Sequence, residues 1–220
     1  MQQHQMLSLA DQVFEVIEKD ILVGTYEKGE VLTEARLCDQ LRVSRTPVRE
    51  AIKRLCQEHL LEVTPKGMSV IGISAEDILD IYEIRYRLEG LAARRAVENI
   101  TPEALKEMEE TLELQQFYAS KQDLESMKNM DSLFHQDIYR FCGSNPLKYT
   151  LEPLVMRIVK YRKASLSVPD RAARSLEEHW AIYNAIADRD ADRAEQLMKN
   201  HIYAASASLL KELGRELRRD

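Results

Sequence analysis

The chain has 220 residues, of which 45% are hydrophobic and 31% are charged, and it contains only 7 glycines and 6 prolines. This composition supports a packed globular core and excludes a disordered or collagen-like chain. The net charge of -6 excludes a uniformly basic surface for nucleic acid, so any contact with DNA must be local.

The cysteines indicate a reducing compartment. Cys38, Cys56 and Cys142 are widely spaced and include no C-x-x-C pair, which argues against a zinc knuckle or a redox dithiol. The first residues lack the basic flank and apolar run of a signal peptide, and no stretch approaches the ~18 apolar residues of a membrane span. We therefore expect a cytoplasmic protein with no membrane partner.

A domain boundary is predicted near Ile73, where a short segment rich in β-branched residues gives way to long helical periodicity. We expect a first domain over residues 1–73 and a second over residues 74–220. Residues 1–74 are not basic overall, but residues 42–67 contain six basic and three acidic side chains. Positive charge is therefore concentrated in one part of the first domain.

The first domain is expected to contain three helices. Apolar residues recur at helical spacing over residues 9–22 and 34–41, with Thr33 as the N-cap of the second helix. A third helix is predicted to begin after Ser44, a residue type that caps helices, and to end near His59.

A β-hairpin is predicted to follow these helices. Two runs of alternating apolar and polar residues, 61–64 and 68–71, flank Pro65-Lys66-Gly67, which is typical of a hairpin with a basic tip. Three helices and a hairpin are the elements of a winged helix-turn-helix, so residues 1–73 are predicted to be a winged-helix DNA-binding domain.

The second domain is predicted to be all helical. From Ala75 onward strand signals are almost absent, and capping or breaking residues separate six or seven amphipathic stretches. The expected fold class is therefore mainly α, with the N-terminal winged helix joined to an all-α antiparallel helical bundle. The less periodic segment 165–175, which holds Pro169, is predicted to be a mobile connection between helices.

Five residues are candidates for contact with DNA. Arg45, Thr46 and Arg49 lie near the start of the third helix, where a recognition helix presents side chains to base edges, and arginine matches the two acceptors of guanine. Lys66 and Gly67 lie at the hairpin tip and suit a close approach to phosphates or the minor groove. The alternative is that these side chains form only the solvent-exposed face of a helix and of a hairpin tip and do not bind DNA.

A longer pattern resembles a known family. The run Val43-Ser44-Arg45-Thr46-Pro47-Val48-Arg49-Glu50-Ala51-Ile52, preceded by Glu34-x-x-Leu37 and followed by Arg54-Leu55, resembles the winged-helix signature of GntR-family transcription regulators. The resemblance implies a homodimer that reads a two-fold symmetric DNA operator through Arg45, Thr46, Arg49 and Gly67. The chain departs from the pattern at Lys28, where proline is usual, and at His59, where glycine is usual. Arg36 lies one residue after a position at which some FadR-like members use an arginine on DNA.

A metal site is predicted in the second domain. Asp131 and His135 are four residues apart and therefore share one face of a helix, while His179 and His201 lie among apolar residues on later helices. A single such histidine is more often a core residue, but three imidazoles and a carboxylate suit Zn²⁺, Ni²⁺ or a similar divalent transition metal.

This set also resembles a known domain. Asp-x-x-x-His followed by two separated histidines, with Glu83-x-Arg85-x-x-Leu88-Glu89 near the start, is similar to the FCD-type domain of FadR-like GntR regulators. The resemblance implies that residues 74–220 form an effector-binding and dimerisation domain. It also implies a small organic-acid effector beside the metal, fixed by an arginine. Arg85 is the first candidate for this role and Arg157 the second; the alternative for Arg85 is an ion pair with Glu89.

The predicted function is a ligand-responsive, sequence-specific transcription regulator, a repressor and not an enzyme. One alternative keeps DNA binding but makes the metal purely structural, with no effector. Another is an all-α metalloenzyme, but the sequence contains no His-Glu-x-x-His, no Gly-x-Ser-x-Gly and no glycine-rich phosphate loop.

Overall fold

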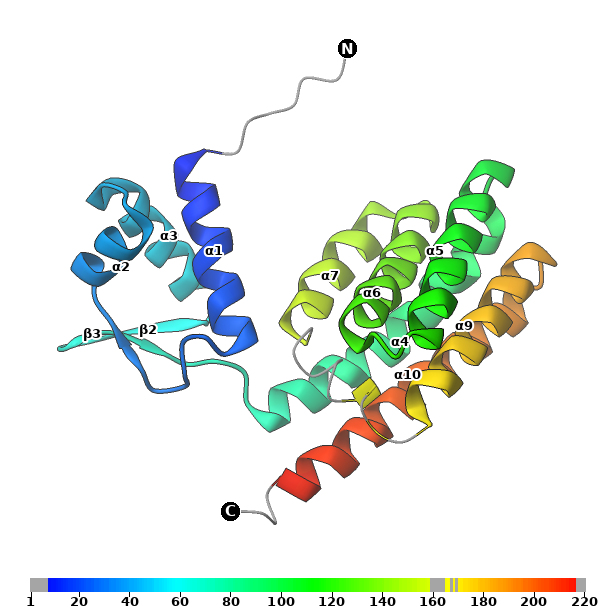
Figure 1. Ribbon diagram of the computed structural model, residues 1–220. Coiled ribbons are helices and arrows are strands. Elements are labelled where there is room, and N and C mark those ends of the chain that lie inside the picture. The colour runs from blue at the N-terminus through cyan, green and yellow to red at the C-terminus, as the bar shows by residue number, and fades with distance from the viewer. Residues whose placement is uncertain (1–7, 159–164, 167, 169, 217–220) are drawn as a thin grey trace. The chain divides into compact units, whose positions relative to one another are not determined.

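The computed structural model describes residues 8–158, 165, 166, 168 and 170–216 (Figure 1). The contacts within the chain divide it into two compact units, Met1–Ser74 and Ala75–Asp220.

The first unit contains three helices, each close to its predicted range: α1 (Leu9–Val23), α2 (Glu34–Leu41) and α3 (Arg45–Gln57). Thr33 caps α2 as predicted, because its hydroxyl accepts the Arg36 N–H at 3.3 Å. Ser44 occupies the N-cap position of α3 as predicted, but its side chain makes no capping hydrogen bond. The prediction is therefore right about the position and wrong about the hydrogen bond.

The end of α3 contains one of the departures from the family pattern, His59 in place of the usual glycine. His59 adopts a left-handed conformation with φ of 55°. The His59 N–H donates to the Cys56 carbonyl at 3.1 Å and the Leu60 N–H donates to the Leu55 carbonyl at 2.9 Å. This pair of bonds is a Schellman ending, in which glycine is usual because it has no Cβ. A histidine therefore adopts the conformation that glycine adopts more easily.

A three-stranded antiparallel sheet completes the first unit, in the order β1 (Val31–Leu32), β3 (Gly67–Val70), β2 (Leu61–Thr64). The predicted hairpin is present, with Thr64 paired to Gly67 across a two-residue turn. Strand β1 was not predicted, since two residues carry too little pattern and its pairing to β3 is distant in sequence.

One hydrophobic core holds these elements together. It combines the inner faces of α1 and α3 with side chains from α2 and from the sheet. Ile17, Leu32, Leu37, Val48 and Leu55 have no exposed surface. The opposite face of α3 is thereby left in solvent.

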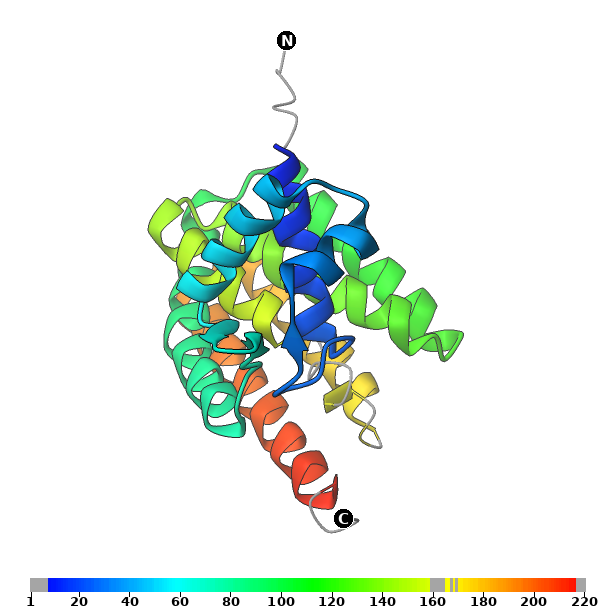
Figure 2. The ribbon, with the colours of Figure 1, turned by 90° about the vertical axis from the view of Figure 1, so that its left-hand side faces the viewer.

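The second unit is all helical over the residues that the structure describes. Its helices are α4 (Ala75–Asn99), α5 (Pro102–Ser120), α6 (Leu124–Phe141), α7 (Asn145–Arg157), α9 (Arg171–Ala187) and α10 (Ala191–Glu216). The long helices α4 and α10 pack side by side (Figure 2). The predicted fold class, a winged helix followed by an all-α bundle, is confirmed. None of the helices described is long and apolar enough to cross a membrane.

The predicted connection over residues 165–175 is partly wrong. Helix α9 begins at Arg171, so residues 171–175 form its first turn and a half and are not a mobile link. Residues 165 and 166 are also helical. Pro169 lies outside the described residues. The inward face of α9 therefore begins eight residues before His179.

Candidate DNA interface and candidate metal centre

The exposed face of α3 carries the predicted DNA-contacting residues. Arg45, Thr46 and Arg49 are all exposed in its first two turns, while Pro47 and Val48 between them are buried. A helix anchored on one side and bare on the other can enter a major groove.

Arg49 is paired with an acidic residue of α2. Both carboxylate oxygens of Glu34 accept a hydrogen bond from Arg49 Nε, at 3.0 and 2.9 Å. The terminal nitrogens Nη1 and Nη2 of Arg49 have no hydrogen bond to the part of the chain that the structure describes. Arg36, by contrast, donates from Nη1 to Glu30 at 2.7 Å.

The hairpin tip presents Lys66 to solvent, and Gly67 follows it with φ of 140°. A Cβ built on Gly67 would lie 2.6 Å from the Leu32 carbonyl oxygen. Glycine is thus required here by the close approach of β1, which is a structural reason that the sequence alone did not reveal.

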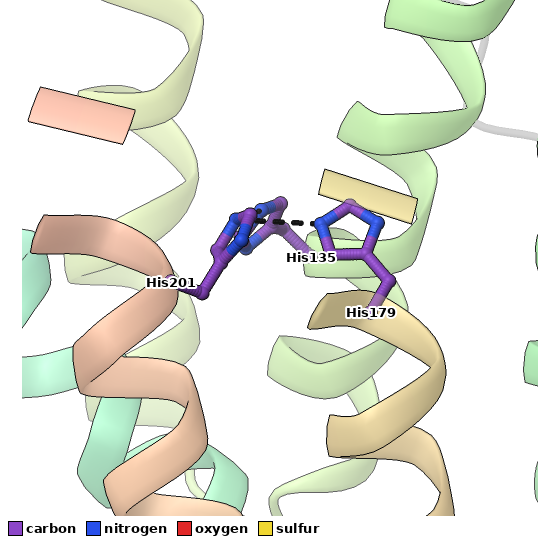
Figure 3. Close-up of side chains that lie close together, drawn as sticks. All are labelled: His135, His179 and His201. Atoms are coloured by element: carbon purple, nitrogen blue, oxygen red, sulfur yellow. Dashed lines mark hydrogen bonds between the residues drawn. The ribbon is translucent and has the colours of Figure 1, made fainter. Parts of the chain in front are cut away.

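The three buried histidines meet in the second unit. His135 on α6, His179 on α9 and His201 on α10 point toward one another (Figure 3). The Nε2 atom of His201 lies 3.3 Å from that of His179 and 3.2 Å from that of His135. One ligand atom from each of the three histidines lies within 4.8 Å of the ligand atoms of the other two.

The outer nitrogen of each histidine has its own partner. His135 Nδ1 lies 2.6 Å from Glu89 Oε2, and His201 Nδ1 lies 2.7 Å from Glu178 Oε2. His179 Nδ1 lies 2.9 Å from Gln115 Oε1. Each partner atom is an acceptor, so each Nδ1 carries the proton and each Nε2 of the neutral ring directs a lone pair at the centre.

Burial favours these neutral rings. Desolvation, followed by the neighbouring imidazoles, holds the pKa values of His179 and His201 well below the ordinary value of 6.5. Burial alone would raise the pKa of Glu89, but the charge of Arg85 and the contact with His135 outweigh it and hold that pKa below its usual range. Three converging lone pairs without protons repel one another unless a cation lies between them.

Asp131, the fourth predicted ligand, lies at the edge of the cluster. Its Oδ1 is 3.6 Å from His179 Nε2 and accepts a hydrogen bond from Ser175 Oγ at 3.1 Å. The structure therefore brings the three predicted histidines together, and places Asp131 beside His179 but outside the group of mutually close donor atoms. A donor set of three imidazoles and one carboxylate, with outer partners on the imidazoles, fits a divalent transition metal.

A small cavity of about 10 Å³ adjoins the cluster. Its lining residues are Tyr82, Arg85, Asp131, His135, Ser165, Leu166, Arg171, Ser175, His201 and Ala205. Of the two arginines predicted to hold an effector, Arg85 lines this cavity. Arg157, in the last turn of α7, is not among the described residues that line it.

Arg85 is also committed to an ion pair. It is 2% exposed and donates from Nε to Glu89 Oε1 at 2.5 Å. This is the alternative that the sequence left open for Arg85. A different arginine, Arg171, lines the cavity with 2% exposure and was missed. Its spacing of eight residues from His179 was the available signal, because that spacing places both on one helix face.

The fold and the site define a class: a DNA-binding protein in which a winged helix is joined to a helical domain with a histidine-lined centre. Family models match the chain as "Bacterial regulatory proteins, gntR family" over residues 9–71 and as "FCD domain" over residues 80–204. The chain belongs to the GntR family of bacterial regulators, in the FadR-like group that carries an FCD domain. It is a transcription regulator and not an enzyme, so the metalloenzyme alternative is set aside.

The relatives that match this chain over most of their length are named as transcription regulators. The HTH-type transcriptional repressor RspR of Escherichia coli (strain K12) is 28% identical over 199 residues, which cover 90% of this chain and 87% of the relative. The HTH-type transcriptional regulator McbR of the same strain is 35% identical over 153 residues, 69% of each chain. The gluconate operon transcriptional repressor of Bacillus subtilis (strain 168) is 28% identical over 177 residues, covering 77% of this chain and 72% of the relative.

A solved structure shares the whole fold. The structure of E. coli McbR/YncC superimposes with a TM-score of 0.79 at 29% identity and covers 94% of this chain and 100% of that chain.

Proposed function

We propose that this regulator is a metal-dependent repressor that responds to a small carboxylate. The observation that carries the proposal is the convergence of three unprotonated Nε2 atoms, each from an imidazole whose Nδ1 is held by Glu89, Gln115 or Glu178. Outer partners of this kind fix the tautomer and raise the basicity of a metal-binding imidazole.

In this proposal His135, His179 and His201 hold a divalent ion, with Asp131 as the fourth donor. Zn²⁺ is favoured by the nitrogen-rich donor set, and Ni²⁺ is also compatible. When bound, the ion supplies an electrophilic centre for the oxygen atoms of an acid. The protein's part is to exclude bulk water and to fix the orientation of the ligands.

The winged helix supplies the DNA contacts of the proposal. Arg45, Thr46 and Arg49 read base edges in the major groove, and Lys66 and Gly67 approach the backbone or the minor groove. Two copies of the chain read a two-fold symmetric operator as a homodimer. RspR and the gluconate operon regulator are named as repressors, which supports repression by this chain too.

The response to the acid requires unequal affinity. An effector shifts DNA binding only if it binds the DNA-bound and the free arrangements with different free energies. We expect release from the operator on effector binding.

Metal content is the first test. Full-length protein is loaded with Zn²⁺, dialysed and measured by elemental analysis, beside a variant with His135, His179 and His201 changed to Ala. The expected result is about one ion per chain in the wild type and a loss of this ion in the variant. His59→Asn is the matched control, because His59 is exposed on the other unit and asparagine tolerates its left-handed backbone.

If the triple variant does not fold, His201→Gln replaces it, with the zinc affinity measured against a competing chelator and folding followed by circular dichroism. Equal zinc affinity in wild type and His201→Gln would contradict the proposal.

One observation favours a second candidate function, a structural metal with no effector. The cavity beside the histidines has a volume of about 10 Å³, roughly the space for one water molecule. The two functions predict different effects of added acid on the melting temperature, because a ligand that binds only the folded state raises the melting temperature. A zinc-loaded protein that no small carboxylate stabilises would be a DNA-binding regulator with a structural metal.

A further inference from the structure

The exposed face of α3 carries three cations, and one of them has an acidic partner. Arg45, Arg49 and Lys53 are spaced by four residues, so their side chains lie along one exposed face. Among these three, only Arg49 forms an ion pair within the described part of the chain, and its partner is Glu34 of α2. A surface that binds DNA gains affinity from cations, so the presence of this acid calls for a physical reason.

An acid in this place costs affinity for DNA. A duplex carries one negative charge for about every 1.7 Å of its axis, and Glu34 lies within hydrogen-bond distance of a side chain proposed to enter the groove. One reason for the acid is local, because Glu34 is the first residue of α2 and acids stabilise a helix near its N-terminus. The geometry of its contact with Arg49 indicates a second reason.

The contact covers one edge of the Arg49 guanidinium and leaves another edge free. Both carboxylate oxygens of Glu34 accept from Nε, at 3.0 and 2.9 Å, whereas Nη1 and Nη2 have no hydrogen bond to the described residues. A guanidinium can present two donors to guanine side-on, through Nε and one terminal nitrogen, or end-on, through Nη1 and Nη2. Glu34 occupies the Nε–H that side-on reading requires, so the end-on edge remains for a base.

No other hydrogen bond or ion pair of the described residues fixes the direction of that edge. The Arg49 side chain is 61% exposed even in contact with Glu34, and both side chains line an open hollow of about 530 Å³ with residues of α3 and with Val63 of β2. Glu34 itself is well placed, because Thr33 caps its helix and Leu37 anchors that helix in the core. The acid therefore sets where the cation points.

We propose that Glu34 is a positioning residue for base recognition: it directs the Nη1 and Nη2 edge of Arg49 to the O6 and N7 atoms of one guanine in the operator. The inference rests on the proposed function, in which Arg49 reads a base edge. A side chain that is ordered before DNA arrives loses less conformational entropy on binding. The acid also repels the phosphates of every sequence, and only the guanine offsets this loss, so Glu34 favours the operator over other DNA.

The test compares the affinities of full-length protein for operator and for random DNA by fluorescence anisotropy, at one salt concentration. The operator comes from selection among random duplexes, and copies with 7-deazaguanine at one guanine at a time each lack a single N7 atom. The variants are Glu34→Ala, which removes the contact, and Glu34→Gln, which keeps an acceptor for Nε without the charge. Glu50→Gln is the control, because Glu50 is an exposed acid next to Arg49 on α3 with no ion pair to the described residues.

Arg49→Ala should lower the ratio of operator affinity to random affinity about 5- to 150-fold, the equivalent of one bidentate base contact. Glu34→Ala should lower this ratio about 2- to 10-fold, because the DNA must then immobilise Arg49 itself, and it should raise the affinity for random DNA. Glu34→Gln should raise the affinity for random DNA similarly but keep more of the ratio. In Glu50→Gln both affinities should rise alike, with an unchanged ratio.

Two further readouts connect the effect to Arg49. Glu34→Ala should reduce the affinity loss that 7-deazaguanine causes at the guanine read by Arg49. In an Arg49→Ala background, Glu34→Ala should leave the ratio unchanged, because the acid acts on the base only through the arginine.

Three results would overturn the inference: an unchanged ratio in Glu34→Ala, a further fall of the ratio in the double variant, or an operator affinity that rises more than the random affinity when the acid is removed. The last result would make Glu34 an inhibitory contact. An unchanged ratio with a lower melting temperature in Glu34→Ala would assign the acid to the stability of α2 alone. An unchanged ratio in Arg49→Ala would instead remove the base contact of the proposed function, and the inference with it.

Discussion

The two units of this regulator handle their polar residues in opposite ways. In the winged helix the charged side chains lie in solvent over an apolar core, and the Arg49–Glu34 pair is 61% and 35% exposed. In the helical unit the charged and titratable groups Arg85, Glu89 and His135 contact one another in a row, and each side chain is at most 2% exposed. The first arrangement costs little stability and leaves side chains available to a partner. The second is stable only while every member keeps its neighbour.

The difference decides which substitutions matter for folding and which for binding. An exposed ion pair contributes little because water already solvates both charges. A buried pair contributes little in net terms when intact, but its loss strands a charge in the protein interior. Substitutions of the buried charges in the helical unit should therefore act first on stability, and those of the exposed charges on α3 first on affinity for DNA.

The sharpest version of this comparison lies within one helix. Arg85–Glu89 and Arg87–Glu83 are both pairs four residues apart on α4, one buried and one 70% and 61% exposed. Arg85→Met should lower the free energy of unfolding by about 3–5 kcal/mol, because Glu89 is left charged and buried. Arg87→Met should cost less than about 1 kcal/mol. Urea unfolding followed by circular dichroism measures both, and equal effects would break the comparison.

Stability should also depend on pH through the buried histidines. Desolvation lowers the folded pKa values of His179 and His201, so below pH ~6.5 the unfolded chain binds more protons than the folded chain. Stability is therefore present above this value and is lost as the pH falls through it. Metal-free protein should lose about 1.4 kcal/mol per histidine between pH 7.5 and 5.5.

Urea unfolding of chelator-treated protein at several pH values measures this loss. The matched variant is His179→Gln with His201→Gln, whose stability should vary less over the same range. An equal pH dependence in wild type and variant would assign the effect to other groups.

On the exposed side, Arg49→Ala should weaken binding to the selected operator by about 1–3 kcal/mol if Arg49 reads a guanine. The operator is obtained by selection from random duplexes with full-length protein, and affinities are measured by fluorescence anisotropy. An equal loss on both DNAs for Arg49→Ala would make Arg49 a phosphate contact.

Lys66→Ala should weaken binding to operator and random DNA alike and reduce the salt slope by about 1.

The smallest expected effect concerns the end of α3. His59→Gly relieves a left-handed backbone but also frees the unfolded chain, so the net stabilisation should be within about 1 kcal/mol. The thermal midpoint of the first unit measures it, with exposed Gln57→Ala as a control that leaves the backbone conformation unchanged. A lower midpoint would show that the histidine side chain contributes to the cap.

What the sequence predicts well is local. The cap at Thr33, the hairpin around Pro65-Lys66 and the same-face pair Asp131–His135 each depend on residues a few positions apart. Strand β1 and the free donors of Arg171 depend on contacts between distant segments, which spacing alone does not specify. The pairing of Arg85 was one of two alternatives that only the geometry could separate.

The outer partners of the histidines come from α4, α5 and α9, and the histidines themselves from α6, α9 and α10. One ion bound at the centre would thus act as a cross-link among five of the helices described. Its loading would slow the exchange of backbone amide hydrogens across much of the bundle, well beyond the residues that touch it. A single atom would then set the rigidity of a domain.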